Sequence, residues 1–250
     1  MPEGPEVHRM VVSLSHTFRN SVIRSIVIMS GKYVSKRPFG YDTIVNQLPI
    51  KIKSINNKGK FIWIDTSSPN NDHWTIWITL GLTGELSTDE GANSRIKFIT
   101  SKGVFYINDP LSFGTIHFMH NPADLVRKLK TLGPDPLQEH VTLDMFTSRL
   151  NKMNPDLIIA DALLNQSLLS GVGNYIRAEA LYDAKINPFT PIKGLDEDTQ
   201  KRLLASIKKV MKTFYTHPDT EFKVYRREVA PDGKEVYASK TARDRTIYYV

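Results

Sequence analysis

The fold is decided by residues 164–181, which read LNQSLLSGVGNYIRAEAL. Gly171 and Gly173 permit a tight turn and the close approach of another backbone. A helix is expected to begin at Asn174, and the N–H groups of its first turn, with the helix dipole, are suited to binding a phosphate. The Asn174 side chain can add a donor to the same phosphate. Two glycines before a helix also occur in plain helical hairpins, which is the structural alternative for this segment.

The elements on either side of this segment differ in kind. On the N-terminal side, a helix over 5–18 is followed by short strands separated by turn residues, a pattern typical of a β-sandwich. On the C-terminal side, helical periodicity dominates until a β-like tail after residue 221. We therefore expect an α+β fold with a two-sheet β-sandwich over 1–120, a helical domain over 121–220 and a β-hairpin over 221–250. The expected strands are 22–29, 50–55, 61–64, 74–80, 96–100 and 104–107, and the expected helices of the second half are 123–132, 142–150, 154–165, 174–184 and 196–215.

Composition narrows the class of protein. The 250 residues are 40% hydrophobic and 24% charged, which is ordinary for a soluble globular protein. No apolar run is long enough for a membrane span, so no membrane partner is expected. The formal net charge of +7 suits nucleic acid or another polyanion, although many proteins with this charge bind neither. The chain has no cysteine, which excludes disulfides and thiolate metal sites.

The first six residues, Met1 to Glu6, read MPEGPE and carry a candidate nucleophile. Removal of Met1 would leave Pro2 with a secondary amine, and an α-amino group has a pKa of roughly 7.7–8.0, so much of it is neutral near pH 7. A neutral amine can attack an aldehydic carbon to form a Schiff base. Glu3 beside it could shuttle protons, and Glu6 would support it within one turn. The alternative is an ordinary chain start whose acids favour a helix N-terminus.

Residues 2–6 and 164–181 together resemble the formamidopyrimidine-DNA glycosylase/endonuclease VIII family. Gly4 is typical of its endonuclease VIII branch, and residues 164–181 resemble its helix–two-turn–helix signature. The resemblance implies a bifunctional DNA glycosylase/AP lyase of base excision repair, in which Pro2 attacks the sugar C1′ and Glu3 supplies a proton. It implies double-stranded DNA with oxidised bases or abasic sites as the partner, with single-stranded DNA left open. We expect no cofactor, a monomer, and an intracellular location with the genome, the nucleus in a eukaryote.

The same resemblance assigns phosphate contacts. Lys60, in Asn57-Lys58-Gly59-Lys60-Phe61, matches a family lysine that contacts the phosphate beside the lesion and is needed for catalysis; the alternative is a solvated strand-end lysine. Gly173 and Asn174 would contact the phosphates through the turn. Arg245 matches the essential finger arginine, because it lies five residues before Val250, where the third finger cysteine would stand, and this register favours it over Arg243. The alternative for Arg245 is one more surface arginine.

The finger itself departs from the family. Residues 222–226 and 243–249 resemble the two sides of its zinc finger, but the four cysteines are missing. We therefore expect a zincless finger that holds no metal. Such a hairpin must be stabilised by packing, since two strands alone are marginally stable.

Two loops are expected to fill the void left by an extruded base. Family members often use a Met in one loop and an Arg and a Phe in another, whereas this chain has Leu82, Leu111 and Phe113. Leu82 and Phe113 can wedge into a base stack, but Leu111 cannot make the hydrogen bonds of the family's Arg to the orphaned base. We expect weak discrimination of the base opposite the lesion.

The interval between Phe214 and Phe222 bears on the choice of lesion. It is only seven residues long, too short for the loop that covers 8-oxoguanine in the formamidopyrimidine branch. Oxidised pyrimidines are therefore the expected substrates.

Two other classes of protein stay open at this level. One is a non-catalytic DNA-binding protein, selective for damage or structure, on the same scaffold. The other is an RNA-binding β-sandwich with a helical appendage, although aromatic stacking motifs are not evident.

Overall fold

The computed structural model describes residues 2–70, 72–241 and 245–250. It divides the chain into two compact units, one with Pro2 and residues 6–130, the other with residues 3–5 and 131–250. The division at residues 120 and 220 stays a prediction.

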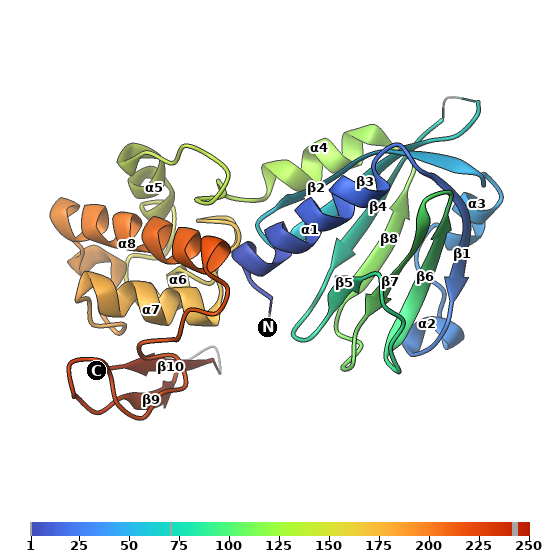
Figure 1. The fold of residues 1–250 in the computed structure, drawn as a ribbon. Coiled ribbons are helices and arrows are strands. Elements are labelled where there is room, and N and C mark those ends of the chain that lie inside the picture. The colour runs from blue at the N-terminus through green and yellow to red at the C-terminus, as the bar shows by residue number, and fades with distance from the viewer. Residues whose placement is uncertain (1, 71, 242–244) are drawn as a thin grey trace. The chain divides into compact units, whose positions relative to one another are not determined.

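The first unit is built on a single antiparallel sheet (Figure 1). The strand order is β5-β7-β6-β1-β2-β3-β4-β8. The short edge strand β5 and the far edge strand β8 were not expected from the sequence. The strands are β1 (Val22–Ile28), β2 (Ile50–Lys58), β3 (Phe61–Ser67), β4 (His73–Thr79), β5 (Glu85–Ser87), β6 (Ser94–Thr100), β7 (Gly103–Asn108) and β8 (Thr115–Met119).

The two layers of the expected sandwich are the two halves of this sheet. Between β1 and β2 the paired residues are Val22 with Lys51 and Ile23 with Ile50, whereas β1 pairs with β6 along most of its length. The narrow β1–β2 seam lets the sheet fold, and alternate side chains point inward from both halves. The α+β class is thus confirmed. The shared core includes Ile23, Ile26, Ile52, Ile62, Ile64, Ile76, Phe98, Phe105 and Phe118.

Helix α1 (Gly4–Phe18) buries one stripe against this core. Val7, Val11, Leu14 and Phe18 recur at the spacing of a helical face, and each is at most 3% exposed. Three short helices complete the unit: α2 (Lys32–Ser35), α3 (Tyr41–Val45) and α4 (Pro122–Lys130).

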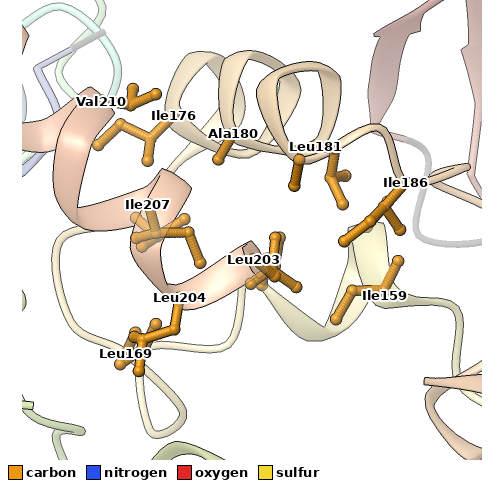
Figure 2. Packing of buried hydrophobic residues seen from close by; sticks show 14 of the residues in the cluster. Ile159, Leu169, Ile176, Ala180, Leu181, Ile186, Leu203, Leu204, Ile207 and Val210 are labelled. Atoms are coloured by element: carbon orange, nitrogen blue, oxygen red, sulfur yellow. The ribbon is translucent and has the colours of Figure 1, made fainter. Parts of the chain in front are cut away.

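The second unit is mainly helical. Its elements are α5 (Leu143–Leu150), α6 (Ile159–Ala162), α7 (Asn174–Ala184), the 3-10 helix η1 (Ile192–Gly194) and α8 (Glu197–Thr216). Figure 2 shows Ile176, Ala180 and Leu181 of α7 facing apolar side chains of α8 such as Leu203 and Ile207. Asp196 caps α8 by accepting a hydrogen bond from the Thr199 amide at 2.8 Å.

The expected helix start at Asn154-Pro155 is wrong. Asn154 instead forms a turn, with its side chain accepting from the Asp156 amide, and helix begins only at Ile159. The reason is long-range pairing: the Ile159 amide donates to Thr190 O and the Ile192 amide donates to Leu157 O. A capping side chain before proline predicts a helix only when no other backbone competes for the following amides.

The C-terminal hairpin consists of β9 (Tyr237–Lys240) and β10 (Thr246–Tyr249). It packs on the helices through Ile247, which is fully buried in the same cluster as Val224 and Ala230. None of the helices within the described ranges is long and apolar enough to cross a membrane.

Candidate active site

The residues predicted to form the site fall in both units. The first unit holds Pro2, Glu6, Lys60, Leu82, Leu111 and Phe113, and the second holds Glu3, Gly173, Asn174 and Arg245. Met1, whose removal the Pro2 chemistry requires, and Arg243, the arginine that the register disfavours, lie outside the described residues.

The Glu3 carboxylate lies at the N-terminus of α7. Its two oxygens accept hydrogen bonds from the amides of Tyr175 at 2.9 Å and Ile176 at 3.3 Å, and the residue is 1% exposed. The next residue, Gly4, donates its amide to Gly171 O at 2.9 Å. A negative charge on Glu3 is stabilised here by the helix dipole as well as by the two amides.

Gly173 makes this arrangement sterically possible. A Cβ at this position would lie 2.3 Å from Glu3 Cδ and 2.4 Å from its Oε1. Its φ of −136° is one that any residue can adopt. Glycine is therefore needed here for space and not for backbone conformation.

This geometry corrects one expectation about the turn. Two first-turn amides of α7, those of Tyr175 and Ile176, are occupied by Glu3 and are not free for a phosphate. Asn174 remains the candidate phosphate ligand. Its Oδ1 is buried and has no hydrogen-bond partner among the described residues, and its amide group carries the donors that a phosphate requires.

Lys60 follows a turn that is tied to helix α1. Gly59 adopts φ of +55°, and its carbonyl accepts from Asn57 Nδ2 at 2.9 Å. The Oδ1 of the same Asn57 lies 2.9 Å from His8 Nδ1. His8 and Asn57, which the sequence did not single out, thus fix the Lys60 turn to the helix that begins just after Pro2.

Glu6 lies two residues before His8 on the same helix. Its Oε1 is 3.4 Å from Arg9 Nη2. Placed in the first turn, its charge also favours the positive end of the helix dipole.

The two expected void-filling loops lie side by side. A Cβ on Gly81 would come within 2.9 Å of Gly114 N and Phe113 Cβ, so the loop that carries Leu82 packs on the loop that carries Leu111 and Phe113. We call residues 109–114 the wedge loop. Leu111 is 50% and Phe113 59% exposed, whereas Leu82 is half-buried.

Arg245 is exposed and immediately precedes β10. Its carbonyl accepts from the Thr241 amide at 3.0 Å, which closes the hairpin around it.

Two buried charged residues of α7 bind the backbone of the C-terminal segment. Glu179 is 2% exposed, and its carboxylate accepts from the amides of Lys223, Val224 and Tyr225, each at 2.9 Å. Arg177 is fully buried, and it donates to Thr246 O of β10 at 2.9 Å and to Ala160 O at 3.0 Å. No group of three or more His, Asp or Glu side chains suited to a metal occurs in the described part of the chain.

The surroundings of Arg177 explain its electrostatics. Burial lowers the pKa of its guanidinium to about 10, against the opposing effect of Asp161, whose Oδ1 lies 3.7 Å away. Arg177 and Glu179 were not singled out from the sequence, although both lie within the quoted segment 164–181.

Comparisons with known proteins relate both parts of the chain to one family. Residues 1–116 match the model of the formamidopyrimidine-DNA glycosylase N-terminal domain, and residues 132–219 match that of the formamidopyrimidine-DNA glycosylase H2TH domain. A formamidopyrimidine-DNA glycosylase of Aliivibrio fischeri (strain MJ11) is 28% identical over 244 residues, which cover 95% of this chain and 84% of that protein. One of Arabidopsis thaliana is 28% identical over 280 residues, covering 100% of this chain and 70% of that protein.

Solved structures show the same fold. The MutM (Fpg) protein of Thermus thermophilus superposes with a TM-score of 0.85 at 22% identity, covering 100% of this chain and 97% of that one. The Lactococcus lactis Fpg in complex with DNA containing an abasic site gives 0.85 at 23% identity, covering 99% and 97%. These likenesses do not resolve the branch, so the endonuclease VIII-like assignment stays a prediction. The chain is an enzyme of the formamidopyrimidine-DNA glycosylase/endonuclease VIII family, the DNA glycosylases of base excision repair.

Proposed function

We propose that the chain is a bifunctional DNA glycosylase/AP lyase that works through an N-terminal Pro2 Schiff base. The observation that carries the proposal is the position of the Glu3 carboxylate. It is buried, it accepts hydrogen bonds from the amides of Tyr175 and Ile176, and Glu3 directly follows Pro2 in the chain. A carboxylate so fixed loses little freedom in the reaction, which is the condition for efficient proton transfer.

The chemistry follows from these two groups. The Pro2 nitrogen forms a bond to C1′ of the damaged nucleotide, and the bond from C1′ to the base breaks, with the base leaving with the electron pair and taking a proton from water. Glu3 takes the proton that the amine loses and gives it to the ring oxygen as the C1′–O4′ bond opens to the iminium. The iminium acidifies the adjacent C2′–H, so removal of that proton expels the 3′ phosphate by β-elimination, and δ-elimination then releases the 5′ phosphate.

The phosphates would be held by Lys60, Asn174 and Arg245. In support, Lys60 follows a turn fixed by Asn57, and Arg245 precedes Thr246, whose carbonyl accepts a hydrogen bond from the buried Arg177. Fixed donors cost less ordering entropy on binding than mobile ones. The partner is duplex DNA that contains oxidised bases or abasic sites, with single-stranded DNA as a further candidate.

We propose that oxidised pyrimidines are preferred over 8-oxoguanine. The chain leaves α8 at Thr216, and by Lys223 its backbone is already bonded to Glu179. Only a turn, closed by the Thr220 amide on His217 O, lies between them, which leaves no length for a covering loop.

Borohydride trapping on an abasic-site duplex tests the Schiff base. The wild-type chain without Met1 should give a covalent protein–DNA adduct, and Pro2→Gly should greatly reduce it. The matched control keeps Pro2 but blocks its amine with a retained Met1, as verified by intact mass, and should give no adduct. If the unblocked wild type gives no adduct but still binds the duplex, the rival proposal of a non-catalytic DNA-binding protein is favoured.

A further inference from the structure

The wedge loop combines exposed apolar side chains with a backbone that is fixed at both ends. Within the loop, the Ser112 amide donates to Asp109 O at 3.1 Å and the Gly114 amide donates to Asp109 Oδ2 at 2.6 Å. Ser112 has φ of +55°, a left-handed conformation that costs a non-glycine residue roughly 1–2 kcal/mol. The loop keeps this conformation because its surroundings determine it.

Arg95 of β6 holds the first end of the loop. Its Nε donates to Asp109 O at 2.8 Å and its Nη2 to Pro110 O at 3.0 Å. The guanidinium is itself fixed, because Nη1 donates to Ser30 Oγ at 2.9 Å and that hydroxyl donates to Ser94 O at 2.7 Å. The planar fork of an arginine suits several acceptors at once.

Lys32 and Tyr33 hold the other end. Both donate to Gly114 O, from Lys32 Nζ at 2.6 Å and from Tyr33 Oη at 3.2 Å. The Tyr33 hydroxyl also accepts from the Ile116 amide at 3.1 Å, at the start of β8.

We propose that Arg95 is a positioning residue for base extrusion: it pre-forms the wedge loop so that Leu111 and Phe113 enter the base stack without further ordering. This inference rests on the proposed glycosylase function and on the void-filling role expected from the sequence for those two side chains. The physical reason is that ordering a mobile segment consumes part of the binding free energy, and a segment fixed beforehand avoids this loss. Unstacking a base step already costs a few kcal/mol, so a mobile wedge would insert slowly and incompletely.

A fluorescence experiment tests this without any chemistry on the DNA. The probe is a duplex with a tetrahydrofuran abasic analogue and 2-aminopurine at the orphaned position, whose emission reports insertion of a side chain. At saturating protein, Arg95→Met should lower the amplitude or the rate of the fluorescence change at least fivefold relative to wild type. The matched control is Arg24→Met, an exposed arginine of β1 in the same unit, which should behave as wild type.

A double-mutant cycle separates positioning from general destabilisation. In a Phe113→Ala background the wedge is absent, so Arg95→Met should have little further effect on the fluorescence signal. Should Arg95→Met fold poorly, Tyr33→Phe removes one hydroxyl from the other end of the loop, and it should slow insertion in the same direction.

Equal amplitudes and rates for folded Arg95→Met and Arg24→Met, or an unchanged signal for Tyr33→Phe where Arg95→Met does not fold, would overturn the inference. Because the probe cannot form a Schiff base, a negative result here is distinct from failure of the Pro2 mechanism. A positive result would stand even if the trapping experiment gave no adduct.

Discussion

Substituting Gly173 by alanine is the most direct way to displace the Glu3 carboxylate from the amides of Tyr175 and Ile176. The new Cβ would lie 2.3 Å from Glu3 Cδ, where ordinary contact begins at 3.4 Å. The carboxylate must therefore retreat by about 1 Å, and a displacement of that size can reduce catalysis about 100-fold. Since φ of −136° suits alanine, the backbone itself adds no strain.

The same displacement carries a cost in stability. It leaves the amides of Tyr175 and Ile176 buried without their acceptor, at about 1–3 kcal/mol each. We expect Gly173→Ala to lower the free energy of unfolding by about 2–6 kcal/mol. This loss of stability should be smaller in a Glu3→Ala background, where no carboxylate lies next to the new Cβ.

Urea denaturation and the rate of borohydride trapping measure these two effects. Gly91→Ala serves as the control, because its Cβ would find only Asn108 Nδ2 at 3.9 Å and should change stability by no more than about 0.5 kcal/mol. A Gly173→Ala chain with wild-type stability and wild-type trapping would show that Glu3 does not occupy this position in solution.

Four further results are expected. Glu179→Gln should destabilise the C-terminal segment by about 2–4 kcal/mol and accelerate its proteolysis, because the single carbonyl oxygen of glutamine cannot accept from three backbone amides. The control Glu228→Gln, at an exposed position, should change neither stability nor proteolysis. A metal chelator should leave wild-type activity unchanged. Excision rates in matched duplexes should be higher for thymine glycol than for 8-oxoguanine, and the reverse order would refute the argument from the short interval after α8. Incision of a lesion opposite each of the four bases should differ by less than tenfold, since Leu111 offers no hydrogen bond to the orphaned base. Burial, and secondarily the Lys32 ammonium, lower the pKa of His117; the unfolded chain then binds the proton more readily, so the free energy of unfolding should fall as the pH drops below about 6.5, and His117→Gln should flatten that dependence in urea titrations.

Elements whose stabilising contacts are local could be predicted from the sequence, and elements that depend on distant partners could not. Helix α7 runs over the residues expected for it, because its glycine turn and its helix-forming residues, such as Ala178, Ala180 and Leu181, lie within the segment itself. Strands β5 and β8 were missed because they are short, with three and five residues. Their place in the sheet depends on pairing with β7 and β4.

In the candidate site, too, contacts between residues far apart in the chain could not be predicted from the local sequence. The sequence identified Glu3 and Gly173 separately, but their contact joins residues far apart in the chain, and nothing in the local pattern indicates that one occupies the space left by the other. The bracing of the wedge loop by Arg95 is equally non-local. In a strand that alternates between polar and apolar residues, an arginine is expected to point to solvent. Only the fold brings Arg95 to the carbonyls of Asp109 and Pro110.

Helix α7 connects the proposed catalytic carboxylate with the C-terminal segment. Its N-terminus holds the Glu3 carboxylate, and within its next turn Arg177 and Glu179 hold two parts of the C-terminal segment through backbone groups. Backbone acceptors and donors have fixed positions, so these buried charges can replace the rigidity that a metal gives to a small hairpin. A zincless finger therefore does not require a looser active site, because the element that orients Glu3 is the same one that orients the strand following Arg245.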